Sequence, residues 1–144
     1  MMELMEQQRE QRIRLWFDMW LQAEDRGIMS IFAPDCIYTE SWGPEYHGAA
    51  QVKHWFEEWN ARGRVLVWDI LRFFHTESHT AVEWRFKNQM LDGRAEEFDG
   101  FSLIRWTADG KIASLKEFGC NIQTYDPYAD GPVPRFRQEG ARWF

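Results

Sequence analysis

Two hydrophobic periods follow one another along the chain, and they separate predicted helices from predicted strands. Between residues 5 and 26, apolar side chains recur at helical spacing with Glu, Arg and Gln between them, which predicts an amphipathic helix. Gly27 ends that helix, and a short second helix is expected over residues 28–32, before Pro34. Helical spacing returns over residues 48–62, and Gly63 is expected to cap this third helix.

From residue 64 onward the hydrophobic period changes to two. Four strands are predicted, and turn residues separate them at hairpin spacing: 64–75, 80–90, 94–106 and 111–121. An earlier strand is expected over residues 35–42, where Gly43-Pro44 ends it. Consecutive hairpins form an antiparallel sheet, which can bury one face against the helices. The predicted fold class is therefore α+β.

The length of the chain is that of one domain with a real core. We expect that domain over residues 1–124, followed by an irregular C-terminal arm over residues 125–144. The arm contains three of the five prolines together with several aromatic residues. These rings suggest that the arm packs on the body or on a neighbouring subunit.

Composition and charge exclude several classes of partner. The net charge is −6 and no dense run of Lys or Arg occurs, so nucleic acid and anionic membranes are not expected to bind. Cys36 and Cys120 lack the spacing of a redox or metal motif, and we predict two small buried thiols in a reducing compartment. No signal-peptide pattern and no long apolar span occur, which predicts a soluble cytoplasmic protein.

Aromatic residues are unusually frequent, with nine Trp, eleven Phe and four Tyr. They could form a ring-rich core, or they could wall a pocket, since small-molecule sites are often lined by aromatic side chains. The stretch from Glu40 to Tyr46, Glu-Ser-Trp-Gly-Pro-Glu-Tyr, favours a pocket. A carboxylate among rings loses solvation, so its pKa should rise toward values useful for proton transfer or for holding a polar ligand.

Strand alternation extends this prediction to a second carboxylate. If Glu40 faces inward, so do Tyr38 and Trp42, and on the last strand Leu115 and Glu117 share a face. Two carboxylates in one cavity push their pKa values apart, which yields one acid and one base. The alternatives are structural. Glu40 could pair with an Arg or cap the Pro44 turn, and Glu117 could form a cross-strand ion pair.

Other chemistry has little support in the sequence. The spacing of His75 and His79 suits metal binding only on a helix, so no metal is predicted. No Ser or Cys nucleophile is flanked by a recognisable base, no glycine motif would cradle a phosphate, and no cofactor is expected. Asp99 is expected to pair with an Arg of the next strand.

Five short landmarks occur in the order found in a known superfamily. They are Ile-Phe-Ala-Pro-Asp at 31–35, His-Gly at 47–48, Ala-Val-Glu-Trp at 81–84, Phe-Asp-Gly at 98–100 and Gly-Lys-Ile at 110–112. Over roughly residues 8–121 the chain resembles nuclear transport factor 2-like proteins, and within them the SnoaL-like proteins. The resemblance implies a cone-shaped antiparallel sheet, as in cystatin-like folds, wrapped around a long N-terminal helix with two further helices. It also implies a pocket between helix and sheet, and a homodimer formed through the outer sheet face.

Enzymes of this superfamily suggest roles for individual positions. Glu40 falls where the similar ketosteroid isomerases keep an Asp general base. Phe17 and Ser102 fall where those isomerases have an oxyanion-hole Tyr and a protonated Asp, so this resemblance does not favour enolate-stabilising isomerase chemistry. Glu117 is the carboxylate nearest to the acid/base position of polyketide cyclases, near the end of the last strand.

These observations predict a site and leave two functions open. The predicted catalytic residues are Glu40 and Glu117, and the predicted ligand-binding residues are Phe17, Trp20, Tyr38, Trp42, Trp55, Trp59, Trp84, Phe86, Ser102 and Asn121. One function is cofactor-free acid/base chemistry of the isomerase, cyclase, dehydratase or hydrolase class, with Glu40 as base, on an apolar, ring-containing small molecule. The other is a non-catalytic ligand-binding or homodimeric assembly module.

Overall fold

A computed structural model describes residues 2–137 of the chain; residues 138–144, which belong to the predicted arm, lie outside that range. The predicted order of helices and strands is confirmed, and one short strand is added. The elements are α1 (Met2–Gln22), α2 (Ile28–Ile31), β1 (Phe32–Thr39), β2 (Glu45–His47), α3 (Ala49–Arg62), β3 (Gly63–His75), β4 (His79–Met90), β5 (Ala95–Trp106) and β6 (Ile112–Asn121).

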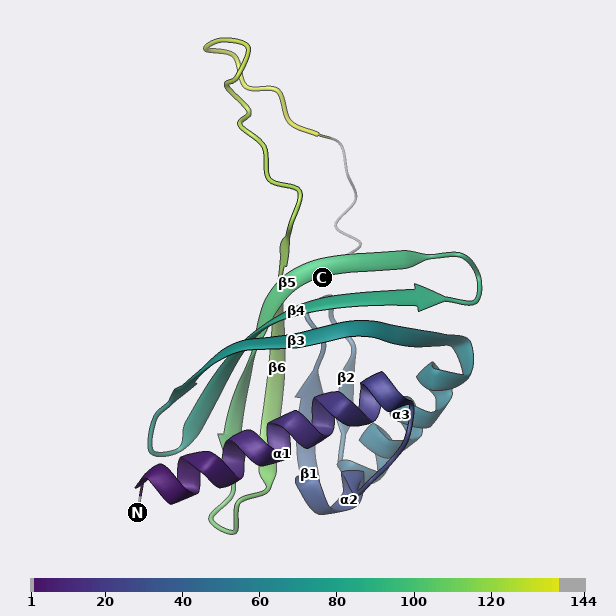
Figure 1. Cartoon of the computed structure of the whole chain (residues 1–144), viewed down its shortest axis with the longest axis vertical. Helices are drawn as coiled ribbons and strands as arrows, with labels where there is room; N and C mark the ends of the chain where they lie inside the picture. Colours follow the sequence, from purple (N-terminus) through teal and green to yellow (C-terminus); the bar gives the residue numbers. More distant parts are fainter. Residues whose placement is uncertain (1, 138–144) are drawn as a thin grey trace.

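The strands form one curved sheet in the order β2-β1-β6-β5-β4-β3. Neighbouring strands are antiparallel except for β1 and β6, which pair in parallel. Figure 1 shows the sheet bending around α1, with α2 and α3 on the same side of the sheet. The predicted α+β fold, a cone-shaped sheet around a long N-terminal helix, is therefore confirmed.

The concave face of the sheet holds the core. In β4 the predicted alternation is observed, because Val82, Trp84 and Asn88 are buried while Glu83, Arg85 and Lys87 alternate with them and are more exposed. Trp16 of α1 is completely buried and packs edge-on against Phe32, with ring centroids 4.8 Å apart. Each large apolar side chain that is fully buried in this way stabilises the fold by about 1.5–3 kcal/mol.

The segment after β1 differs from the prediction. We expected a strand over residues 35–42, but β1 ends at Thr39, and Trp42 lies in a turn and is exposed. The backbone N–H of Glu40 donates to the Pro44 carbonyl at 2.8 Å, and this contact reverses the chain. The three-residue strand β2 then pairs with β1. Strand β2 is too short for alternation to reveal it.

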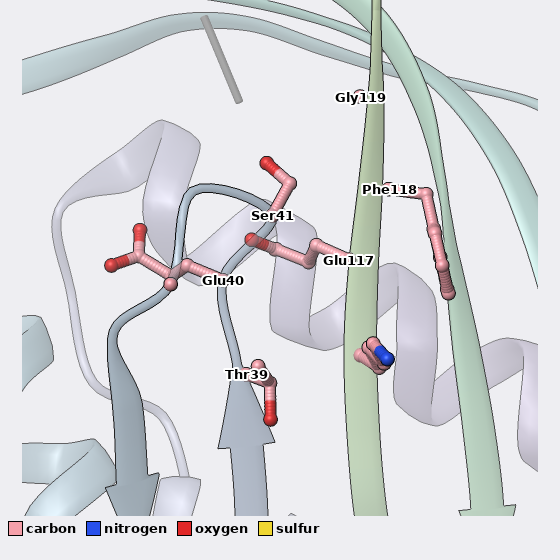
Figure 2. Close-up of a pocket in the computed structure, with 8 residues that line it drawn as sticks. Thr39, Glu40, Ser41, Glu117, Phe118 and Gly119 are labelled. Carbon is pink, nitrogen blue, oxygen red and sulfur yellow. The ribbon is translucent and has the colours of Figure 1, made fainter. Parts of the chain in front are cut away.

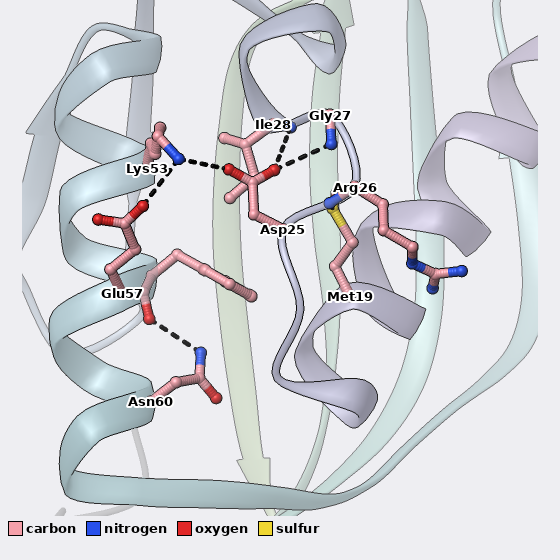
Figure 3. A network of polar contacts seen from close by, with 9 residues as sticks. Met19, Asp25, Arg26, Gly27, Ile28, Lys53, Glu57 and Asn60 are labelled. Carbon is pink, nitrogen blue, oxygen red and sulfur yellow. Dashed lines mark hydrogen bonds and ion pairs between the residues drawn. The ribbon is translucent and has the colours of Figure 1, made fainter.

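A polar cluster ties the loop after α1 to α3 (Figure 3). One carboxylate oxygen of Asp25 accepts hydrogen bonds from the backbone N–H groups of Gly27 and Ile28, both at 2.9 Å. The other oxygen accepts one from Lys53 Nζ at 2.7 Å, and Lys53 also pairs with Glu57 at 2.7 Å. This cluster fixes where α2 begins relative to α3.

The two cysteines differ in their surroundings. Cys36 is buried, as predicted, and burial raises the pKa of its thiol to about 11. Cys120 is exposed, so the prediction of a buried thiol is wrong there. Cys120 has the outward parity of Lys116 and Phe118 on β6, so it faces away from the core. Asp99 forms an ion pair with Arg85 Nε at 3.0 Å, so it does pair with an Arg, but this Arg lies on the preceding strand β4 and not on the next one.

The C-terminal arm leaves the body at the end of β6. Residues 122–137 contain neither helix nor strand, and Figure 1 shows them extending away from the sheet. Tyr128, Val133 and Phe136 are exposed. The described part of the arm therefore does not pack on its own body, and contact with a neighbouring subunit stays a prediction. Within residues 2–137, no helix has the length and apolar character needed to cross a membrane.

Candidate functional site

A cavity of about 930 Å³ opens between the helices and the concave face of the sheet. Nine aromatic side chains line it. The helices, β2 and the turn before β2 contribute Trp20, Trp42, Tyr46, Trp55 and Trp59, and β3 to β5 contribute Trp68, Trp84, Phe86 and Phe98. This volume and lining are typical of a small-molecule site.

The rings hold one another in fixed positions. Tyr46 stacks on Trp55 with ring centroids 4.3 Å apart and an interplanar angle of 15°. Trp20 contacts both Trp55 and Trp59, with centroid distances of 4.9 and 5.3 Å. Edge-to-face and offset pairs of this kind add about 0.5–1.5 kcal/mol each beyond burial. The cavity walls are thus preformed.

Three indole N–H groups of the cavity wall do not point into the cavity. Trp84 Nε1 donates to Ser102 Oγ at 3.0 Å inside the sheet. The N–H groups of Trp20 and Trp68 are buried and have no partner among the described residues. These three tryptophans therefore present carbon surface to the cavity.

Glu40 and Glu117 bring carboxyl groups to one end of this aromatic cavity. Strands β1 and β6 pair in parallel, and their last pair is Thr39 with Lys116. The residues that follow this pair, Glu40 and Glu117, therefore lie side by side. Figure 2 shows Glu117 pointing from β6 toward the turn that carries Glu40. The structure thus brings together the two predicted catalytic residues.

A tyrosine hydroxyl binds each carboxyl group. Tyr38 donates to Glu117 Oε2 at 2.5 Å, and Tyr46 donates to Glu40 Oε2 at 2.7 Å. Neither glutamate forms an ion pair with another described residue. The structural alternatives, an ion pair of Glu40 with an Arg or a cross-strand pair of Glu117, are therefore not observed.

Burial gives the two glutamates higher pKa values than ordinary carboxylates have. Loss of solvation, and then the nearby charge of Glu40, raise the pKa of Glu117 to about 8, against the opposing hydrogen bond from Tyr38. Burial also raises the pKa of Glu40, but hydrogen bonds from Tyr46 and Trp42 oppose the rise. Near neutral pH, Glu117 is thus the protonated member of the pair.

A second, smaller cavity of about 350 Å³ is lined by the same two glutamates (Figure 2). It is lined by Thr39, Glu40, Ser41, Gly43, Lys116, Glu117, Phe118 and Gly119. The cause is local: β1 stops at Thr39 while β6 continues to Asn121, so the sheet is open beyond their last pair. Glu40 and Glu117 thus line both cavities.

Two arginines lie among the residues that line the large cavity. Arg62 forms a double hydrogen bond with Glu58, at 2.6 and 3.0 Å, and Arg94 pairs with Asp92 at 2.8 Å. Their side chains are 48% and 69% exposed, which places them at the mouth. Both charges are already compensated by acidic neighbours.

Most of the predicted site residues meet in this cavity. Those that line it are Trp20, Glu40, Trp42, Trp55, Trp59, Trp84, Phe86 and Glu117. Four others do not line it. Phe17 is buried behind Trp68, with ring centroids 3.8 Å apart, Tyr38 and Ser102 bind wall residues from behind, and Asn121 lies at the end of β6.

Sequence reasoning missed several residues of the lining. Tyr46 belongs to the short strand that alternation did not reveal, although it ends the stretch that pointed to the site. Phe98 shares the inward parity of β5, so alternation could have identified it. Trp68 follows a register shift between Val65 and Val67 that breaks the alternation of β3. Arg62 and Arg94 had no such signal, because the end of a helix and a hairpin bring them to the mouth, whereas Glu96 shares the parity of Phe98. Among the described residues, no group of three or more His, Cys, Asp or Glu is placed to hold a metal ion.

Comparison with known proteins agrees with this architecture. The family model of the SnoaL-like domain matches residues 13–115, which is most of the chain. The chain belongs to the SnoaL-like domain family. The SnoaL-like match ends just before Glu117, so it includes only one of the two carboxyl groups. No curated protein matches the sequence significantly.

Solved structures resemble this SnoaL-like chain in fold and share little sequence with it. A proposed isomerase from Bacillus subtilis has a TM-score of 0.70 at 11% identity, over 81% of this chain and 88% of its own. A proposed polyketide cyclase from Xanthomonas campestris pv. campestris has a TM-score of 0.67 at 15% identity, over 81% and 93%. A ketosteroid isomerase-like protein from Catenulispora acidiphila, solved with trimethylamine, has a TM-score of 0.63 at 17% identity, over 77% and 85%.

Proposed function

We propose that this SnoaL-like domain binds a small molecule with an apolar, ring-containing body and performs cofactor-free acid/base chemistry on it. The observation that carries the proposal is the pair of carboxyl groups, Glu40 and Glu117, at one end of a cavity otherwise walled by rings. Family membership supports a ligand-binding, isomerase or cyclase role at a general level.

Glu40 is the proposed base and Glu117 the proposed acid. Glu40 keeps its charge more readily, because Tyr46 and Trp42 both donate hydrogen bonds to it. Glu117 holds its proton up to a pKa of about 8 and can deliver it to an oxygen of the ligand. A proton thus moves from the ligand, or from a water, to Glu40 while Glu117 donates another. The small second cavity offers solvent a separate route for restoring both protonation states.

The aromatic walls would contribute binding and exclude bulk water. Apolar surface removed from water stabilises a complex by about 25 cal/mol per Å². A dry cavity also strengthens the electrostatic effect of each carboxyl group on the bound molecule. Proton removal, cyclisation, dehydration and water addition each need little more than such a positioned acid and base.

Titration and isotope exchange test the proposal together. A panel of enolisable ring ketones is added to the wild type, Glu40→Gln and Glu117→Gln in D₂O, while Trp fluorescence follows binding and NMR follows deuterium uptake. We expect both variants to bind, and Glu40→Gln to lose exchange by roughly 10²-fold or more. Glu45→Gln, which changes an exposed carboxylate outside the cavity, should behave as wild type. If no compound perturbs the fluorescence of the wild type, the binding proposal fails.

One observation favours a non-catalytic alternative. The two positions that the resemblance assigns to enolate stabilisation have packing roles here, since Phe17 lies under Trp68 and Ser102 binds Trp84. The outer sheet face also exposes the stacked pair Phe101 and Phe118, which suits assembly of two copies. The protein would then bind its ligand, or a second copy, without chemistry. In that case the ligands that bind would show no deuterium uptake above the level measured without protein.

A further inference from the structure

The large cavity combines aromatic ring faces with carboxylate groups, and this combination has a ligand preference of its own. The face of an aromatic ring carries partial negative charge, and its edge carries partial positive charge. Nine aromatic side chains line the cavity. A cation placed over the face of Trp or Tyr is attracted by about 0.5–2 kcal/mol, and more than one ring can act on it at once.

Several hydrogen-bond donors of the same walls are already bound or buried. The N–H of Trp84 is bound by Ser102, and those of Trp20 and Trp68 are buried behind the cavity surface. The hydroxyl of Tyr46 donates to Glu40. These four groups therefore offer no donor to an anionic group or a carbonyl oxygen, which leaves protonated Glu117 and the arginines at the mouth for that purpose.

The charged groups of the lining point to the same kind of ligand. Three acidic residues, Glu40, Glu96 and Glu117, line the cavity. The cations of the lining are Arg62 and Arg94, at the exposed mouth, and each is paired with an acidic neighbour. This pairing reduces their repulsion of a cation that lies deeper, although the charge of Arg62 still acts on Glu40 and Tyr46. The net charge of −6 adds a weak long-range attraction for cations.

We propose that the ligand carries an ammonium group, tertiary or quaternary, beside its apolar body, and that this group lies between Glu40 and the stacked rings of Tyr46 and Trp55. Tyr46 joins these partners, since its hydroxyl binds Glu40 at 2.7 Å while its ring stacks on Trp55. A methylated ammonium suits this position, because its methyl groups, unlike N–H groups, need no hydrogen-bond acceptor. The inference rests on the proposed function, whose cavity it shares.

Three probes that share a phenyl ring with a bulky substituent test this inference. Phenyltrimethylammonium and tert-butylbenzene differ in a single atom, nitrogen for carbon, and therefore in charge. Para-tert-butylbenzoate supplies the corresponding anion. Isothermal titration calorimetry, with Trp fluorescence for the sparingly soluble hydrocarbon, measures the affinity of the whole protein for each. Transfer from water disfavours the cation, so any preference for it must come from the cavity.

We expect phenyltrimethylammonium to bind several-fold more tightly than tert-butylbenzene, and the benzoate to bind weakest. Glu40→Gln should lower the affinity for the cation by roughly tenfold and leave that for the hydrocarbon unchanged. The matched variant Glu45→Gln should alter neither. Circular dichroism verifies that both variants are folded.

Two results would overturn the ammonium inference while leaving the proposed function intact. One is equal or tighter binding of the hydrocarbon, and the other is tightest binding of the benzoate, which would assign ligand recognition to Arg62 and Arg94. If none of the three probes binds, the ammonium inference fails. If the ring ketones also fail to bind, the proposed function fails with it. The comparison within the wild type decides the matter even if Glu40→Gln does not fold.

Discussion

Asp25 and Glu117 are carboxylic acids in two regions of one small fold, and their surroundings push their pKa values in opposite directions. Burial alone would raise the pKa of Asp25, but hydrogen bonds from Ile28, Lys53 and Gly27 together hold it below the ordinary value of 3.8. Burial raises the pKa of Glu117, the charge of Glu40 raises it further, and only Tyr38 opposes.

The difference lies in the number of donors that each carboxyl group finds. Asp25 sits in a loop whose backbone N–H groups have no helical partner, so the charged form is well satisfied. Glu117 sits on a strand whose backbone groups belong to the sheet, and it faces rings and another carboxyl group. In the first arrangement, hydrogen bonds to a charged carboxylate stabilise the local structure. The second disfavours the charged form of Glu117, so this group keeps the proton that a proton donor must supply.

The largest expected effect concerns stability against pH. The folded protein holds the Glu117 proton up to a pKa of about 8, whereas an ordinary glutamate loses it near 4.5. Between these values the folded state binds more protons than the unfolded state, so raising the pH destabilises the fold, on the order of a few kcal/mol in total. Glu117→Gln should remove most of this slope, leaving a remainder due to Glu40. Urea unfolding from about pH 5 to about pH 9 measures it.

Above about pH 8, Glu117→Gln is therefore expected to be more stable than the wild type. Glu45→Gln provides the control, because it removes a carboxylate that is exposed outside the cavity. An unchanged slope in Glu117→Gln would mean that Glu117 ionises in the folded protein as it does in water. The contrast with Asp25 would then be lost.

The next effect is loss of the Asp25 acceptor. Asp25→Ala leaves two backbone N–H groups at the start of α2 without their partner and should cost about 1–2 kcal/mol. Asp25→Asn keeps an acceptor oxygen and should recover most of this at neutral pH. Because the Asp25 pKa is lowered, its stabilisation is present above 3.8 and is lost as the pH falls through the lower folded value. Thermal unfolding at neutral and acidic pH checks both statements. Equal stability of Asp25→Ala and Asp25→Asn would contradict the role of the backbone hydrogen bonds.

The long elements of this fold could be predicted from periodicity, and the reason is physical. A helix such as α1 or a strand such as β4 repeats its burial pattern over many residues, so the pattern is recognisable despite single residues that depart from it. The order of these elements was enough to indicate the superfamily. The three residues of β2 could not be predicted, because their place depends on a turn closed by Glu40 and Pro44.

The candidate site was predictable in part, for a related reason. Glu40 and Glu117 stood out because a carboxylate among apolar strand positions is unusual. The alternation of inward and outward positions along the strands predicted which way their side chains point. Their distance from each other depends on the parallel pairing of β1 with β6, which alternation does not specify. The same holds for Asp25 and Lys53, which lie in different elements and meet only through the packing of α2 on α3.

Lys53→Gln is expected to have the smallest effect, and it sharpens the account of Asp25. Lys53 Nζ contacts Asp25 and Glu57 at 2.7 Å each, but its side chain is 40% exposed, and exposed ion pairs contribute little to stability. The backbone hydrogen bonds from Ile28 and Gly27 remain in this variant, so the Asp25 pKa should stay below its ordinary value. NMR titration of the Asp25 carboxyl carbon, with Lys53→Arg as the control that keeps the charge, measures this directly. If Lys53→Gln instead destabilised the protein as much as Asp25→Ala, the lysine and not the backbone would be the main partner of this carboxylate. The contrast with Glu117 would then depend on a neighbouring charge instead of on the number of donors.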